Sequence, residues 1–82
     1  MALKAFVAST SKLLSKFVHD VCRAEDIAVT QMKKETALLE ELSQAEPDLL
    51  FLHASIIEEV DDNIIARIKA DESLSRAYIV IF

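Results

Sequence analysis

Four short, mostly apolar runs recur along the chain, and a longer segment with helical spacing separates each run from the next. The runs cover residues 3–8, 27–32, 49–52 and 77–82, and the run at 49–52 (Leu-Leu-Phe-Leu) shows no alternation. Such runs are typical of strands buried on both faces of a parallel sheet. The order β-α-β-α-β-α-β therefore predicts an α/β fold, with right-handed crossovers and helices on both faces of the sheet.

The first helical segment has the strongest amphipathic pattern in the chain. It follows three potential cap residues, Ser9, Thr10 and Ser11. Its apolar residues recur on one side, which we interpret as the buried side, and they are Leu13, Leu14, Phe17, Val18, Val21 and Cys22.

The other two helical segments are shorter. Residues 36–45 carry an apolar stripe, and Pro47 blocks any continuation of that helix. The stripe is formed by Leu38, Leu39, Leu42 and Ala45. The buried side predicted for the last helix is formed by Val60, Ile64, Ile65 and Ile68. Acidic residues precede or open this helix, where they complement the positive end of its dipole, and they are Glu58, Glu59, Asp61 and Asp62.

Length and composition indicate one small domain that covers residues 1–82. No apolar run approaches the ~18 residues of a membrane span, so we expect a cytoplasmic protein without membrane contact. The chain has no glycine, which phosphate-binding loops need for close backbone approach, so a nucleotide-binding enzyme is strongly disfavoured. The single cysteine, Cys22, can form neither an internal disulfide nor a cysteine metal cluster. We interpret it as a core residue.

Charge is unevenly distributed around a net value of −5. Residues 1–34 carry six Lys or Arg and three Asp or Glu, whereas residues 35–82 carry three and eleven. Nucleic-acid binding needs a basic field, and the stronger field here is acidic, so no nucleic-acid partner is predicted. The asymmetry is explained by solvated helix faces, with a docking role as the alternative.

Three stretches of the chain follow a pattern known from one protein family. Residues 4–14 (KAFVASTSKLL) are similar to the first strand and the following turn of that family, and residues 46–52 (EPDLLFL) to its third strand. Residues 67–71 (RIKAD), with Leu-Ser-Arg at 74–76, are similar to the end of its third helix. The whole chain thus resembles the receiver domain of two-component response regulators. This resemblance implies a flavodoxin-like three-layer sandwich with the parallel strand order 2-1-3-4.

The resemblance also implies which active-site residues are missing. In the family, two acidic residues after the first strand hold magnesium, and an aspartate at the end of the third strand accepts phosphate from a kinase histidine. The corresponding positions here are Ser9, Thr10 and His53, so all three carboxylates are absent. Ile57 and Asp61 stand where the family has a proline and a glycine. Magnesium prefers carboxylate ligands, so neither a metal nor a cofactor is predicted.

His53 has two interpretations. A histidine can carry a phosphoryl group, act as a general base or sense pH near neutrality. No carboxylate or metal that would orient the ring is evident in the sequence. We interpret His53 as a hydrogen-bonded residue that fills a degenerate phosphoacceptor pocket, and phosphotransfer or proton sensing through His53 is the alternative.

In the family, a fifth strand with its lysine and two further helices would follow the position of Phe82. Without them, the fourth strand is an exposed edge with apolar residues on both sides, and the predicted interface is Ala77, Tyr78, Ile79, Val80, Ile81 and Phe82. An unpaired apolar edge is a template for a partner. We expect a homodimer in which these strands or the uncovered sheet faces meet about a two-fold axis. The alternative is that the 82 residues are a fragment of a longer response regulator.

These observations predict a pseudo-receiver, which is a phosphorylation-independent interaction module of bacterial signalling. Its expected partners are a second copy, a sensor kinase or another receiver, and no enzymatic activity is expected. The rival from another class is phosphotransfer through His53. A third interpretation is a structural subunit whose apolar end builds larger oligomers.

Overall fold

The computed structural model describes residues 3–60 and 62–82. In chain order, the elements of these residues are β1 (Lys4–Ala8), α1 (Lys12–Ala24), β2 (Ala28–Gln31), the 3-10 turn η1 (Glu35–Ala37), α2 (Leu38–Ala45), β3 (Leu49–Leu52), the π-helical turn η2 (Ile56–Val60), α3 (Ile64–Ala70) and β4 (Tyr78–Ile81). The predicted alternation of strands and helices is confirmed, and the strand ends differ from the predicted ones by one residue at most. None of the helices in this part of the chain is long and apolar enough to cross a membrane.

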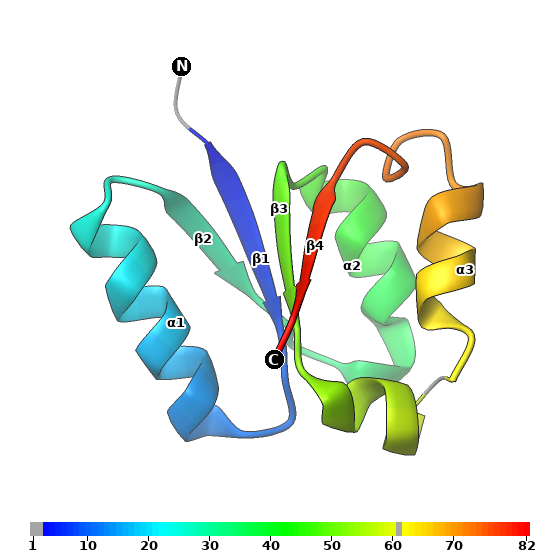
Figure 1. Cartoon of the computed structure of the whole chain (residues 1–82), viewed down its shortest axis with the longest axis horizontal. Coiled ribbons are helices and arrows are strands. Elements are labelled where there is room, and N and C mark those ends of the chain that lie inside the picture. The colour runs from blue at the N-terminus through cyan, green and yellow to red at the C-terminus, as the bar shows by residue number, and fades with distance from the viewer. Residues whose placement is uncertain (1–2, 61) are drawn as a thin grey trace.

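The four strands form one parallel sheet in the order β2-β1-β3-β4. The predicted α/β class and the strand order 2-1-3-4 are therefore confirmed. Because β1 and β3 lie in the middle of the sheet, their side chains are buried far more completely than those of the two edge strands, β2 and β4. Figure 1 shows α1 on one side of the sheet and α2 with α3 on the other, which is a flavodoxin-like three-layer arrangement.

The core lies between the sheet and the pair α2 and α3. Side chains that alternate along β1 and β3 point to this side, because successive residues of a strand face opposite sides of a sheet. The buried cluster is formed by Phe6, Ala8, Leu38, Leu42, Leu50, Leu52, Ile56, Ile64, Ile68 and Leu74. The periodicities predicted for α2 and α3 therefore identify their buried sides correctly.

The apolar side of α1 is only partly buried, which corrects the sequence prediction. Of its six apolar residues, Cys22 is buried, while Leu13, Phe17 and Val21 are 78%, 66% and 49% exposed. A helix is about 10 Å wide and therefore covers only two strands, which lie about 4.8 Å apart. In the described residues α1 is alone on its side of a four-stranded sheet, so half of this side has no helix over it.

The helix predicted after β3 is split in two. Glu58 and Glu59 lie in the first turn of η2, and they precede α3, which begins only at Ile64. The split follows from Ile56, which is fully buried and holds η2 against the core directly after β3. Asp61, which was predicted to act in the same way, lies outside the described residues.

The connection from α3 to β4 is held by Asp71. Its Oδ1 accepts hydrogen bonds from the Ser73 N–H (2.9 Å) and the Ser73 hydroxyl (2.7 Å), and its Oδ2 accepts one from the Ser43 hydroxyl of α2 (3.3 Å). The bonds from Ser73 are the main reason why the pKa of this carboxyl lies below its ordinary value. The ionised form of Asp71 thus links α2 to the turn that delivers the chain to β4.

Candidate functional site

The carboxyl ends of the strands bring the predicted pocket positions together. The His53 N–H donates to the Ala8 carbonyl (2.9 Å), which joins the end of β3 to the end of β1. The Ala54 N–H donates to the Phe82 carbonyl (2.8 Å), which adds the end of β4. As a result, Thr10, which lies in the loop after β1, can form a hydrogen bond to the segment that follows His53.

His53 is held by Ser55, a residue that sequence reasoning missed. The Ser55 N–H donates to His53 Nδ1 (3.1 Å), so this nitrogen is an acceptor, and the Ser55 hydroxyl at 2.7 Å must donate to it as well. The Thr10 hydroxyl lies 3.2 Å from Ser55 Oγ and donates to it in turn. A side chain that accepts from the N–H two residues later is a common local motif, and this motif is the only sequence signal for Ser55.

Ser9 and Ser11 are occupied within their own turn. Ser9 Oγ accepts the Ser11 N–H (3.0 Å) and donates to the Ser11 carbonyl (3.4 Å), and Ser9 is buried. Ser11 Oγ accepts the Leu14 N–H (3.4 Å) at the start of α1. Of the three cap candidates, Ser11 is therefore the N-cap. Ser9 stabilises the turn, and Thr10 belongs to the His53 network.

The chemistry of this pocket is that of hydroxyl groups and an imidazole ring. The Phe82 ring packs edge-on against the His53 ring, with centroids 5.1 Å apart and an interplanar angle of 74°. Across residues 3–60 and 62–82, no three His, Cys, Asp or Glu side chains gather in a way that could hold a metal ion. A serine beside a histidine is a starting point for nucleophilic catalysis. Here His53 Nδ1 also accepts the Ser55 backbone N–H. The contact between His53 and Ser55 therefore caps the helical segment after β3, and we do not interpret it as a catalytic pair.

Cys22 carries the sole thiol of the chain. It is buried beneath α1, as the sequence predicts, and burial raises the pKa of the thiol. The thiolate is the reactive form of cysteine, and a raised pKa keeps the thiol protonated. We therefore interpret Cys22 as a packing residue.

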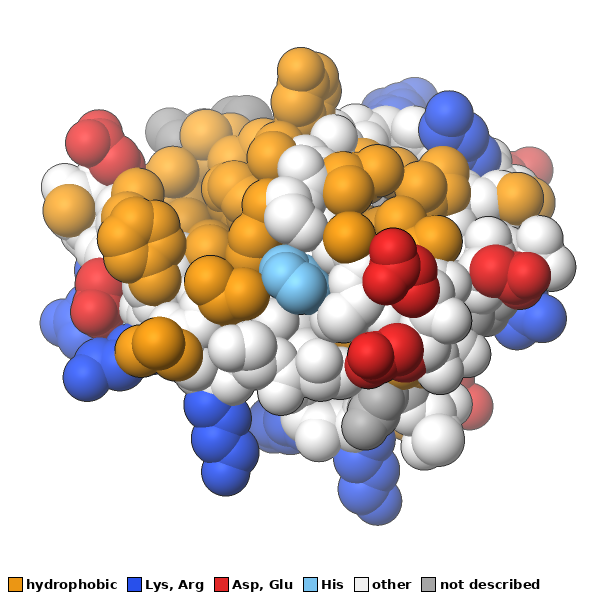
Figure 2. Space-filling model, turned by 60° about the horizontal axis from the view of Figure 1, so that its bottom comes forward, with side chains coloured by type: hydrophobic (Ala, Val, Ile, Leu, Met, Phe, Trp, Pro, Cys, Tyr) orange, Lys and Arg blue, Asp and Glu red, His pale blue; other side chains and the backbone are white. Residues whose placement is uncertain are grey.

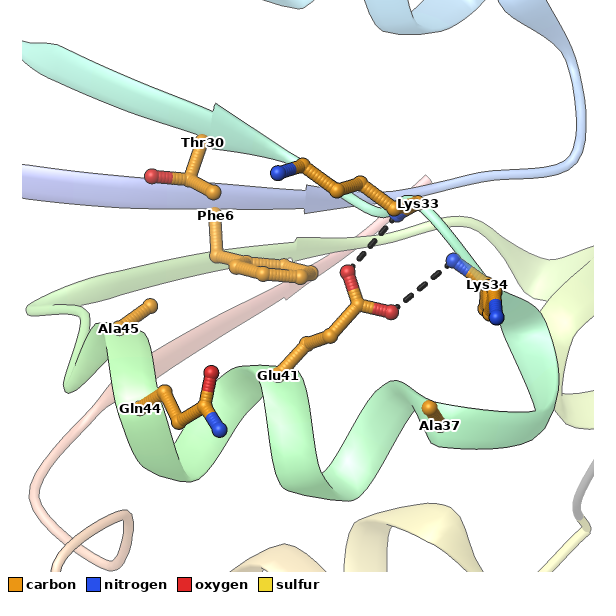
Figure 3. A pocket seen from close by; sticks show the side chains of 8 residues that line it. All are labelled: Phe6, Thr30, Lys33, Lys34, Ala37, Glu41, Gln44 and Ala45. Carbon is orange, nitrogen blue, oxygen red and sulfur yellow. Dashed lines mark hydrogen bonds between the residues drawn. The ribbon is translucent and has the colours of Figure 1, made fainter.

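A pocket of about 430 Å³ opens between the edge strand β2 and α2 (Figure 3). The Phe6 ring lies along one wall, and Glu41 reaches from α2 toward the turn after β2. The Glu41 carboxylate accepts the backbone N–H groups of Lys33 (2.8 Å) and Lys34 (2.9 Å). The charge of Glu41 therefore serves to fix this turn onto α2.

An apolar surface that no helix covers lies on the α1 side of β3 and β4. In the sheet register, Tyr78 lies beside Leu49, and Val80 beside Phe51, and all four point away from the core that α2 and α3 cover. Tyr78 is 69% exposed, and the other three are half-buried. We call this surface, together with the exposed row on α1, the uncovered face: Leu13, Phe17, Val21, Leu49, Phe51, Tyr78 and Val80.

Figure 2 looks toward the end of the sheet where the strands finish, and hydrophobic side chains occupy much of the upper half of that view. Of the predicted interface residues, Tyr78 and Ile81 are exposed large side chains, whereas Ile79 packs against the core. The contribution of α1 was missed. A signal for it exists: the apolar residues of α1 span about half of the helix circumference, more than the roughly 100° that contact with one sheet requires.

Comparison with known proteins does not identify the chain. No protein-family model matches the sequence, and no curated protein matches it. The geometry of the strand ends and of the uncovered face therefore carries the functional argument.

Glu41→Ala is expected to lower the free energy of unfolding by about 1–2 kcal/mol, because two backbone N–H groups lose a charged acceptor. The matched control is Glu40→Ala, which removes an exposed carboxylate from the adjacent position of the same helix and should change stability by less than about 0.5 kcal/mol. Urea denaturation measures both. Equal losses in the two variants would contradict the structural role of Glu41.

Proposed function

We propose that the protein is a phosphorylation-independent pseudo-receiver that acts in bacterial signalling as a protein-interaction and dimerisation module. The uncovered face is the observation that carries this proposal. It combines exposed aromatic and aliphatic side chains from two adjacent layers of the fold, and large exposed apolar surfaces are typical of protein interaction sites.

The strand ends support the same proposal. If the chain is aligned with receiver domains, Ser9 and Thr10 stand at the magnesium-binding positions and His53 stands at the phosphoacceptor position. Here Ser9 is bonded within its own turn, and Thr10 and His53 are both bonded to Ser55. These side chains hold the loops together through their hydrogen bonds, which favours a binding function over phosphoryl transfer.

The cost of leaving the uncovered face in water favours a partner. Fully burying one large apolar side chain contributes about 1.5–3 kcal/mol, while the whole stability of a typical domain is about 5–15 kcal/mol. Burial of even two of the exposed residues, such as Phe17 and Tyr78, is therefore a large gain for a chain of this size.

A second copy is the first partner that we propose, and a sensor kinase or another receiver is the next. Nucleic acid is a poor partner for a chain with a net charge of −5. A cytoplasmic location is part of the proposal, because two-component signalling proteins meet there.

Light scattering coupled to gel filtration tests the dimer. At high micromolar concentration we expect twice the monomer mass, with the monomer emerging on dilution because association follows mass action. Only monomer across this range would contradict the proposed dimer. Species larger than a dimer would instead support a structural subunit that builds larger assemblies.

Incubation with a small-molecule phosphodonor and magnesium tests the alternative through His53. Intact mass measured at neutral pH, where phosphohistidine survives, should show no adduct on the wild-type chain. His53→Ala is the control. An adduct that forms on the wild type and is lost in His53→Ala would overturn the proposal in favour of phosphotransfer.

A further inference from the structure

We infer that the second copy binds face to face, through the uncovered face and not through the edge of β4. The two-fold axis runs parallel to the strands, so that the two α1 helices lie side by side between two sheets. This inference rests on the proposed dimer, and it adds the interface, the symmetry axis and the residues that meet.

The direction of the α1 side chains favours a whole protein as the occupant. Residues of an α-helix advance by about 100° each, and Ser15 and Cys22 are buried against the sheet. Leu13 lies two positions before Ser15, about half a turn away, so it points away from its own sheet. A single helix laid beside α1 would leave Leu13 in water, whereas a sheet laid over α1 covers it. Phe17, one turn further along, is covered in the same way.

One flank of α1 is directed toward the part of the sheet that α1 does not cover. Leu14 and Val21 lie about 90° from the sheet-facing side, and the right-handed crossover from β1 to β2 turns this flank toward β3 and β4. The basic residues Lys16 and Arg23 lie on the other flank, which is directed away from them. The space beside Leu14 and Val21 is two strands wide, about 10 Å, which is the width of one helix.

Symmetry then selects one arrangement. An axis perpendicular to the sheet joins only the β4 edges and leaves both uncovered faces in water. An axis in the plane of the sheet and across the strands places the two α1 helices on top of each other. An axis parallel to the strands moves the α1 of the partner sideways, over β3 and β4. Each α1 then fills the space in the other copy, and both faces are covered by one isologous contact.

The size of the surface suits such a contact. Leu13, Phe17, Val21 and Tyr78 together leave roughly 500 Å² of apolar area in water, since one buried aromatic side chain accounts for about 150–250 Å². A specific interface buries about 800 Å² on each partner. The half-buried Leu49, Phe51 and Val80 add to this area.

The first experiment measures the dimer dissociation constant by sedimentation equilibrium for two matched variants. Phe17→Lys places a charge in the uncovered face and should raise the dissociation constant at least about tenfold, as expected for a central aromatic residue. Ile81→Lys makes the same kind of change at a similarly exposed residue of β4 whose side chain points to the opposite side of the sheet. It should leave the constant within about twofold. Circular dichroism verifies that both variants are folded.

The second experiment is oxidative cross-linking, which does not depend on a loss of binding. Val21→Cys lies on the flank where the two α1 helices meet, and a disulfide needs Cα atoms about 4.4–6.8 Å apart. It should give a cross-linked dimer in high yield. Arg23→Cys, on the opposite flank of the same helix, and the wild type, whose Cys22 is buried, should stay uncross-linked.

The outcomes separate this inference from the proposed function. A wild-type dimer that Ile81→Lys weakens and Phe17→Lys does not, together with no Val21→Cys cross-link, would overturn the face-to-face arrangement and leave the dimerisation module standing as an edge-to-edge dimer. A wild type that remains monomeric at high micromolar concentration would overturn both. A Val21→Cys cross-link with a selective effect of Phe17→Lys is the result expected.

Discussion

A parallel sheet has two apolar faces, and both must be covered, which is the constraint on which this structure depends. On one side, α2 and α3 lie over the sheet and enclose Phe6, Leu50 and Leu52 completely. On the other side, α1 lies alone in the described residues and covers about half of the width. The exposed row on α1 and the exposed Tyr78 at the edge both lie on this half-covered side.

The ends of the strands show the opposite situation, because every polar group discussed there has a partner. His53 and Thr10 are both bonded to Ser55, and Ser9 is bonded within the turn that leads to the cap of α1. The side chains at the strand ends thus serve to hold the loops together. Together, these two regions favour recognition through the uncovered face over chemistry at the strand ends.

Much of the fold could be predicted from the sequence, because the short apolar runs and the helical periodicities each have one regular interpretation. The strand order was available only through the resemblance to receivers. Periodicity shows which side of a helix is apolar but not whether another layer covers it, so the exposure of Leu13 and Phe17 was missed. The role of Ser55 was missed because its bond to His53 depends on a loop conformation that no periodicity encodes.

The chain contains one tyrosine and no tryptophan, so tyrosine emission reports on Tyr78 alone. Acrylamide quenching of this emission, measured from low to high micromolar protein, is the most direct test of the claim that the uncovered face is a contact surface. The account predicts strong quenching of the dilute protein, where Tyr78 is 69% exposed, and progressively weaker quenching as the concentration rises. Equal quenching at every concentration would contradict it.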